Sequence, residues 1–329
     1  MTAIKTAIIG TGAYAPSKLL TNADLEKLVE TSDEWIVERT GIRERHVAAD
    51  DEVTSDMALK ASIRALEMAS TRPEELDLII LGTVTPDMPM PACAAFLQHK
   101  LGARNAMAFD LGAACAGSIF GLSVGDMYVR AGTARRVLVL GAELLTRIVD
   151  WKDRNTCVLF GDAAGAMVLG PSPDPQHGIL GHHLRTEGSL TDILLMKGGG
   201  SRYPMNEERL KQNLHKVWMN GREVYKFAVR ALTESSRAVL EANGLKPSQV
   251  DHVIAHQAII RIIDAILERL EVPRERCWLN IERFGNTSSA SLPTTLDEAN
   301  RAGRLKKGDV ILMMAIGAGM AYGSSVVRW

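Results

Sequence analysis

Residues 105–121 read Asn105-Ala-Met-Ala-Phe-Asp110-Leu-Gly-Ala-Ala-Cys115-Ala-Gly-Ser-Ile-Phe-Gly121, which predicts a strand, a tight turn of small residues and then a helix. This order places the Cys115 thiol at or near a helix N-terminus. Unpaired backbone N–H groups and the helix dipole favour a thiolate there, and a thiolate is a strong nucleophile toward acyl carbons. The alternative is an inert buried cysteine, because free cysteines are among the most buried residues.

Outward from this stretch, apolar runs typical of buried strands alternate with helical patterns, which predicts an α/β layered fold. The expected strands are Thr6–Gly10, Leu76–Gly82, Met107–Leu111, Arg136–Gly141, Ala164–Gly170, Val250–Ala255, Trp278–Ile281, Asp309–Ala315 and Ser324–Trp329. The expected helices are Ser55–Ala69, Pro91–Lys100, Ala116–Ala131, Arg222–Ala242, Ile259–Leu270 and Ser291–Ala302.

The chain also repeats itself once. Cys115 is followed 17 residues later by Gly132, at the end of the motif Arg-Ala-Gly, and Asn286 is followed at the same distance by the Arg-Ala-Gly that ends at Gly303. A basic turn and an apolar strand come next in both places. Two copies of one unit facing each other would bring Cys115 and Asn286 toward one central site.

We therefore expect an N-terminal half over residues 1–170 that carries the cysteine and a C-terminal half over residues 217–329. Residues 171–216 are rich in Gly, Pro and polar residues, including Gly198-Gly-Gly-Ser201, and are interpreted as a connector with loops that could cover substrate.

Composition limits the function classes. The chain has 329 residues, 46% of them hydrophobic, and a formal net charge of −1, which argues against binding to nucleic acid or a membrane surface through bulk charge. The four cysteines form no C-x-x-C pair, which favours a reducing compartment. No apolar stretch is long enough to cross a bilayer, so we expect a cytoplasmic protein.

Three further segments could carry chemistry. His256 follows an apolar strand, where a histidine can polarise a carbonyl or exchange a proton, although a lone histidine is often structural. Asn286 precedes Thr-Ser, which is also a common turn or helix-cap arrangement. The glycine-rich turn after Ala315 can direct backbone N–H groups at an oxyanion, or it can be a plain turn.

Two other motifs are rejected. Gly10-Thr-Gly12 begins like a dinucleotide-binding turn, but Pro16 replaces the third glycine and no clean helix follows. His252 and His256 have the spacing of metal ligands on a helix, but they lie in a predicted strand, and no third ligand is evident. No metal site is expected.

Taken together, the motifs resemble those of β-ketoacyl-[acyl carrier protein] synthase III, an initiating condensing enzyme of fatty acid synthesis. The resemblance covers essentially the whole chain. It rests on Ser32–Ile42, Ala114-Cys115-Ala-Gly117, Phe160-Gly-Asp162, His256-Gln-Ala258, Gly285-Asn286-Thr-Ser288 and Gly323–Trp329. It implies the thiolase fold, with duplicated βαβαβαββ halves in five layers (αβαβα), in a homodimer.

The resemblance implies that Cys115, His256 and Asn286 form a catalytic triad. Cys115 would take an acyl group from an acyl-CoA primer, and malonyl-acyl carrier protein (malonyl-ACP) would then bind. His256 and Asn286 would donate hydrogen bonds to the malonyl thioester oxygen during decarboxylation, and the backbone N–H groups of Cys115 and Ala318 would hold the tetrahedral oxyanion. The expected product is a 3-oxoacyl-ACP.

The resemblance also assigns the substrate contacts. Trp35, Arg39, Arg154 and Gly221 would hold coenzyme A, which is a substrate, so no cofactor is expected. Lys226 and Arg261, with Tyr225, would lie where an acidic carrier protein docks. Met90 and Ile316 would shape the primer pocket, Met90 from across the dimer.

Three positions depart from the family pattern. Ile259 replaces an asparagine that would bind pantetheine, Ile316 stands where a phenylalanine often packs behind the nucleophile, and Glu268 replaces a common lysine.

Three other functions stay open. A related enzyme of specialised metabolism could use another primer or acceptor. A biosynthetic thiolase would need a second cysteine, which the C-terminal turn lacks. A scaffold protein with the same fold would need no reactive thiol.

Overall fold

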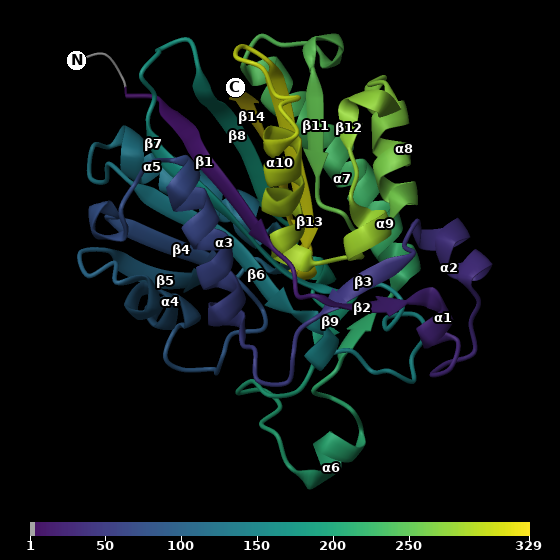
Figure 1. Cartoon of the computed structure of the whole chain (residues 1–329). Helices are drawn as coiled ribbons and strands as arrows, with labels where there is room; N and C mark the ends of the chain where they lie inside the picture. The colour runs from purple at the N-terminus through teal and green to yellow at the C-terminus, as the bar shows by residue number, and fades with distance from the viewer. Residues whose placement is uncertain (1–3) are drawn as a thin grey trace.

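The computed structural model describes residues 4–329 and is built on two five-stranded sheets (Figure 1). The first sheet contains β1 (Thr6–Tyr14), β4 (Leu78–Gly82), β5 (Met107–Leu111), β6 (Val137–Leu144) and β7 (Asp162–Pro171). The second contains β8 (Gly178–Thr186), β11 (His252–Ala255), β12 (Cys277–Trp278), β13 (Val310–Gly317) and β14 (Ala321–Arg328).

Both sheets have the same topology. The first has the order β1-β7-β6-β4-β5 and the second the order β8-β14-β13-β11-β12. In both, the first two neighbouring pairs are antiparallel and the last two are parallel. The same plan is therefore used twice, as the sequence repeat predicts.

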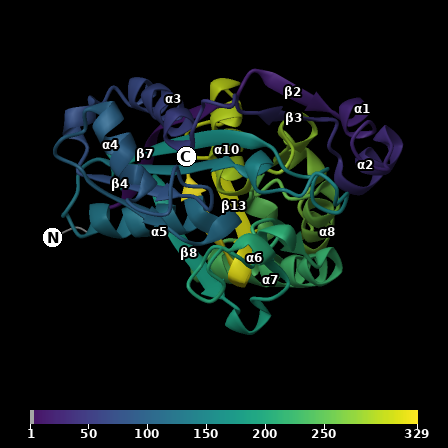
Figure 2. The same ribbon diagram turned by 90° about the horizontal axis from the view of Figure 1, so that it is seen from below.

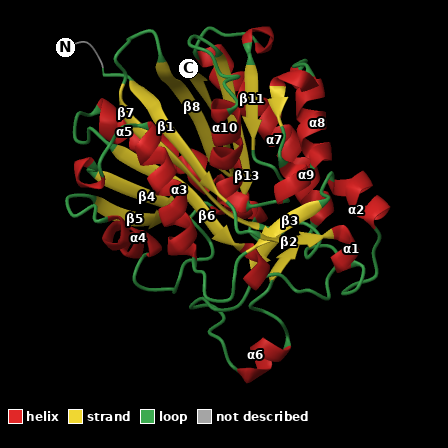
Figure 3. Cartoon of the chain, viewed as in Figure 1, coloured by secondary structure: helices red, strands yellow, loops and turns green. Residues whose placement is uncertain are grey.

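Helices complete five layers. α5 (Gly117–Arg130) and α10 (Ser291–Arg301) lie between the sheets and share a core with both. α3 (Thr54–Met68) and α4 (Cys93–Leu101) cover the outer face of the first sheet, and α7 (Gly221–Ala242) and α8 (Ile260–Leu270) cover that of the second. Figure 2 shows these two outer pairs on opposite sides of the molecule, and Figure 3 shows the helices packed over the strands.

The alternation of side chains along each strand explains the continuous apolar runs. Leu78 and Ile80 belong to the central core, whereas Ile79 and Leu81 belong to the outer core against α3 and α4. Successive side chains of a strand point to opposite faces, so a strand covered on both faces needs apolar residues at every position.

Residues 171–216 were expected to be a connector with loops. They also contain a strand of the second sheet, because β8 lies within them and pairs with β14. The remainder carries β9 (Leu194–Met196) and α6 (Glu207–Lys211), which projects from the body in Figure 1, and β10 (Val217–Met219) follows directly. The strand predicted over Trp278–Ile281 is present but shorter and begins one residue earlier. β12 ends at Trp278, and α9 (Ile281–Phe284) begins where that strand was expected to end.

A smaller unit was not anticipated from the sequence. β2 (Lys18–Thr21) pairs with β3 (Glu44–Val47), and α1 (Asn22–Leu25) and α2 (Asp33–Thr40) connect them.

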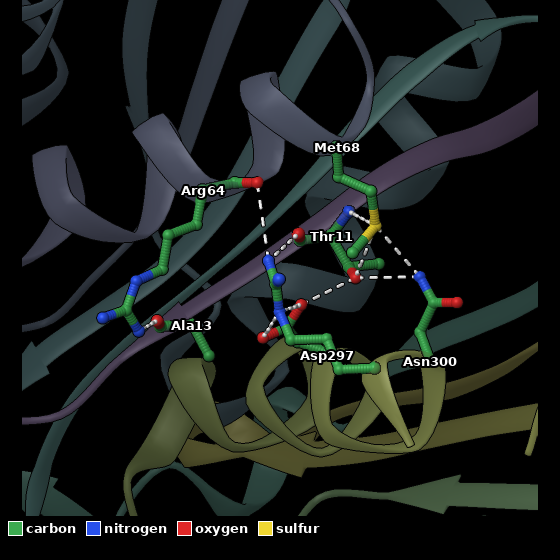
Figure 4. A network of polar contacts seen from close by, with 7 residues as sticks. Thr11, Ala13, Arg64, Met68, Asp297 and Asn300 are labelled. Carbon is green, nitrogen blue, oxygen red and sulfur yellow. Dashed lines mark hydrogen bonds and ion pairs between the residues drawn. The ribbon is translucent and has the colours of Figure 1, made fainter. Parts of the chain in front are cut away.

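A polar network ties the two halves together (Figure 4). The Thr11 hydroxyl on β1 donates to Asp297 on α10 at 2.8 Å, and the Arg301 guanidinium donates to the same carboxylate and to the Thr11 carbonyl. Gly10 and Gly12 of the rejected dinucleotide motif lie in β1, where a Cβ would come within 2.4 and 2.3 Å of α3 carbonyl oxygens. These glycines therefore serve close packing of a helix on a strand.

Candidate active site

One cavity of about 810 Å³ contains all three members of the predicted triad in its wall. Cys115 comes from the turn between β5 and α5, His256 follows β11, and Asn286 precedes α10. All three are buried, with exposed fractions of 9%, 5% and 7%. The two copies of the fold thus contribute to one site.

Cys115 sits in a short 3-10 turn, Ala114–Ala116, immediately before α5. The end of β13 packs directly on this turn, since a Cβ on Gly317 would lie 2.6 Å from the Cys115 nitrogen and 2.5 Å from the Ala113 oxygen. Only glycine allows this approach, which brings the following residue, Ala318, into the cavity wall.

The surroundings of Cys115 oppose the expected thiolate. Burial raises the pKa of the Cys115 thiol to about 12, and contact with the Ser288 side chain offsets this only in part. The position before α5 favours the thiolate, whereas removal from water favours the neutral thiol.

His256 is held at both its backbone and its ring. Its N–H donates to the Met314 carbonyl at 2.8 Å, and its Nδ1 lies 2.6 Å from the Ser291 hydroxyl oxygen at the start of α10. Burial lowers the pKa of the imidazole to about 4, so the ring is neutral at pH 7. With Nδ1 engaged, Nε2 is the ring nitrogen available to the cavity.

The Asn286 carboxamide has a fixed orientation. Its Oδ1 accepts the Ser288 backbone N–H at 2.9 Å, and a backbone N–H can only donate. The side-chain NH₂ group is therefore free to donate. The backbone of Asn286 is fixed by the motif Phe160-Gly-Asp162, because its N–H donates to Leu159 at 2.8 Å and its carbonyl accepts the Gly161 N–H at 3.0 Å.

Sequence reasoning missed a buried carboxylate behind the site. Glu143, in β6 and fully buried, accepts the hydroxyl proton of Ser288 at 2.9 Å and lies 3.0 Å from the Ser289 hydroxyl, which also contacts the Gly82 carbonyl at 2.8 Å. These serines are two and three residues after Asn286. The second oxygen of Glu143 accepts three donors from residues 83–85. Burial raises the pKa of this carboxyl group. A charged residue inside an otherwise apolar strand was the signal that could have revealed it.

The backbone is strained around the cavity. Ala114, Ser288 and Met320 have φ values of 46°, 50° and 48°, and all three line the cavity. Left-handed conformations are unfavourable for residues other than glycine, and they cluster at functional sites whose surroundings enforce them.

Aromatic and basic side chains lie elsewhere on the same wall. The Arg39 and Arg154 guanidinium carbons lie 4.6 and 5.1 Å from the centre of the Trp35 ring. Ser32 caps α2 by accepting the Trp35 N–H at 3.2 Å, which fixes the start of this segment. Gly221, Lys226 and Arg261 also line the cavity.

Comparison with known protein families identifies the family of this chain. Residues 109–188 match the family described as 3-oxoacyl-[acyl-carrier-protein (ACP)] synthase III, and residues 240–329 match its C-terminal region. The chain belongs to the 3-oxoacyl-[acyl-carrier-protein] synthase III family.

Full-length relatives agree. A protein of Caldanaerobacter subterraneus named beta-ketoacyl-[acyl-carrier-protein] synthase III is 51% identical over 99% of this chain and 98% of its own. The crystal structure of the 3-oxoacyl-[acyl-carrier-protein] synthase III of Aquifex aeolicus is 47% identical, covers 98% of this chain and all of its own, and has a TM-score of 0.91. The predicted family, the thiolase fold and the enzyme class, a condensing acyltransferase, are confirmed.

A second solved structure widens the range of relatives. The priming beta-ketosynthase of the R1128 polyketide pathway is 36% identical, covers 99% of this chain and 96% of its own, and has a TM-score of 0.93.

The predicted primer-pocket residues fall in different places in this synthase III chain. Ile316 is 6% exposed and lines the cavity. Ile259 also lines it and is the N-cap residue of α8, where its side chain makes no capping hydrogen bond. Met90 is 84% exposed and does not line the cavity of its own chain. Glu268 is exposed on α8.

His252, which the sequence excluded as a metal ligand, pairs with Asp309 at 3.0 Å. Within residues 4–329, no three His, Cys, Asp or Glu side chains gather in a way that could hold a metal ion. Over the same residues, the helices are too short or too polar to cross a membrane.

Proposed function

We propose that this chain condenses a short acyl-CoA primer, such as acetyl-CoA, with malonyl-ACP to start fatty acid synthesis. The observation that carries the proposal is the shared cavity. A buried thiol and two side chains, each with one polar atom anchored and the other free, line the same space.

In the first half-reaction, the Cys115 sulfur forms a bond to the acyl carbon while the bond from that carbon to the coenzyme A sulfur breaks. The thiol proton leaves on coenzyme A. The Cys115 and Ala318 N–H groups would stabilise the tetrahedral oxyanion, and donors placed in advance at developing charge lower the barrier most.

In the second half-reaction, the malonyl carboxylate leaves as CO₂ and its electron pair forms an enolate at the thioester oxygen. The His256 and Asn286 N–H groups would donate to that oxygen. The enolate carbon then attacks the acyl-Cys115 carbon, which releases the sulfur to take up a proton. The products are a 3-oxoacyl-ACP and the free thiol.

The cavity wall supports both substrates. Trp35 offers a flat face for an adenine ring, and Arg39 and Arg154 beside it offer charge for phosphates. Gly221, at the start of α7, would leave room for the pantetheine arm. Lys226 and Arg261 would attract the acidic carrier protein.

We also propose a homodimer and a cytoplasmic location. β5 is the last strand of its sheet, and the segment after β4 exposes Met88 (44%) and Met90 (84%). A partner covering this edge would bring Met90 toward the other chain's primer pocket. All four cysteines are free, which fits a reducing compartment.

The test separates the two half-reactions. Radiolabelled acetyl-CoA should label wild-type Cys115 but not Cys115→Ala, and labelled malonyl-ACP should release CO₂. His256→Ala should lose most of the CO₂ release while Cys115 is still acylated. A wild-type protein that never carries the acyl group would overturn the proposal.

A second candidate is a condensing enzyme or acyltransferase of specialised metabolism. The similarity to a priming ketosynthase and the isoleucines at 259 and 316 favour it. A primer survey with acetyl-, butyryl-, isobutyryl- and longer acyl-CoA, each with and without malonyl-ACP, distinguishes the two. Acyl transfer to another acceptor without malonyl-ACP would favour the second candidate.

A further inference from the structure

The Ser291 hydroxyl lies behind the His256 ring, away from its cavity-facing nitrogen. Its oxygen is 2.6 Å from Nδ1, and the serine is 1% exposed. Two other groups contact the same oxygen. The Gln257 N–H donates to it at 3.3 Å, and the Ser288 carbonyl can accept its proton at 2.9 Å.

The single hydroxyl proton therefore has two possible acceptors, Nδ1 and the Ser288 carbonyl. That carbonyl also accepts the Ser291 backbone N–H, so it stays paired if the hydroxyl turns to the imidazole. The separation of 2.6 Å between Nδ1 and the Ser291 oxygen is a hydrogen bond, so either the hydroxyl or an Nδ1–H donates across it.

We infer that Ser291 is a positioning residue that donates its hydroxyl proton to His256 Nδ1 and thereby holds the ring with its proton on Nε2. A neutral imidazole carries one N–H, so an acceptor at Nδ1 makes Nε2 the donor. Burial keeps the ring neutral, so only one of its two nitrogens carries a proton.

The inference rests on the proposed function and deepens it. In the Nε2–H form, His256 can donate to the malonyl thioester oxygen but cannot take the Cys115 proton. Ser291 should therefore matter for decarboxylation and much less for acylation. A residue needed only for folding would affect both half-reactions alike.

The experiment compares Ser291→Ala with Ser291→Thr, which keeps a hydroxyl, and with Thr294→Ala. Thr294 is a matched control because its buried hydroxyl lies one turn further along α10 and bonds only to the Ala290 and Ser291 carbonyls. Acylation of Cys115 by acetyl-CoA is followed by intact mass, and CO₂ release from malonyl-ACP by radiolabel. Nitrogen NMR of ¹⁵N-histidine-labelled wild-type protein, with His256→Asn to assign the signals, reports which ring nitrogen is protonated.

We expect Ser291→Ala to slow CO₂ release by about tenfold or more, as for a weakened oxyanion donor, while acylation keeps its rate. Ser291→Thr should recover part of the loss, Thr294→Ala should retain both rates, and wild-type His256 should be protonated on Nε2. Protonation on Nδ1, or equal losses in both half-reactions, would overturn the inference.

The NMR result stands even if Ser291→Ala fails to fold. A wild-type protein that is never acylated would instead overturn the proposed function and leave the tautomer result intact.

Discussion

Asn286 and His256 each use one polar atom as an anchor and leave the other free for the cavity. Oδ1 of Asn286 accepts the Ser288 N–H, and Nδ1 of His256 contacts the Ser291 hydroxyl. Both anchors lie in the short segment Ser288–Ser291 that leads into α10, so this segment orients the two side chains together. A donor fixed before substrate arrives needs no reorganisation during the reaction.

The raised pKa of Cys115 gives a prediction about its reactivity. Because the thiol has a pKa of about 12, alkylation by iodoacetamide should be slow at pH 7 and accelerate with rising pH, as the thiolate fraction grows. Peptide-resolved mass spectrometry across pH 6–10 measures this, with Cys115→Ala as the control for the assigned peptide. Rapid alkylation of Cys115 at pH 7 would contradict it.

Glu143 provides a second prediction at this scale. Glu143→Gln replaces one acceptor oxygen by an NH₂ group, which can only donate. The hydroxyl or N–H groups that contact this oxygen in the wild type would then face another donor. We expect a loss of about 1–3 kcal/mol in the free energy of unfolding, the usual effect of unsatisfied buried groups. Because Ser288 and Ser289 follow Asn286, CO₂ release per folded molecule should also fall.

Asp126→Asn is the matched control for Glu143→Gln. Asp126 is also fully buried and hydrogen-bonded, but its partners are Arg130 and His182 in the central layer. It should lose stability without a selective loss of CO₂ release. Unchanged activity in folded Glu143→Gln would remove Glu143 from the positioning of Asn286.

At the scale of elements, glycines allow the contacts that assemble the site. A Cβ on Gly141 of β6 would lie 2.0 Å from the Ser289 carbonyl oxygen, so alanine there must displace the segment before α10. We expect Gly141→Ala to lower stability by about 1–3 kcal/mol, as overpacking does, and to reduce condensation. Gly188→Ala is the control, because a Cβ there meets no atom within 4 Å. Thermal unfolding and CO₂ release measure both, and equal behaviour of the two variants would contradict the prediction.

Elements with an apolar run or a helical pattern could be predicted from the sequence, even where they lie at the edge of a sheet, as β5 does. β5 has the predicted bounds, and α3, α5 and α10 differ from theirs by one residue at each end or less. β8 was missed because its half-buried positions carry His182 and His183, and its exposed end carries Arg185, in place of an apolar run.

The site shows the same division. Strand ends followed by small residues mark Cys115, His256 and Asn286, since these motifs are local in the sequence. Glu143 acts across the two halves, 145 residues from Ser288, and Ser291 contacts His256 from 35 residues away within the C-terminal half. Only the folded chain shows those contacts. The burial that raises the pKa of Cys115 depends on the whole cavity, so the sequence alone could not show it.

At the scale of the whole molecule, Met90 tests the proposed dimer. Met90 is too exposed to shape the cavity of its own chain, so an effect on primer choice requires a second chain. We expect Met90→Trp to shorten the longest acyl-CoA that acylates Cys115. Met127→Trp, at another exposed methionine, should not. Light scattering should give the mass of two chains, and a monomer with normal activity would contradict the proposal.

The buried imidazole links global stability to pH. Burial lowers the pKa of His256 from 6.5 to about 4, so the unfolded chain binds the extra proton first as the pH falls. The contribution of His256 to the free energy of unfolding is fully present above pH 6.5. It falls progressively toward pH 4, by about 3 kcal/mol. Urea unfolding at pH 7 and pH 4.5 should show a smaller difference for His256→Asn than for the wild type. Equal differences would refute the linkage.

The protonated state of Cys115 has a chemical consequence for the resting enzyme. Oxidation to sulfenic acid begins with the thiolate, so a thiol kept neutral by burial reacts slowly with peroxides and with electrophilic metabolites. A raised pKa at this sulfur would therefore protect the resting enzyme from oxidation and alkylation at neutral pH.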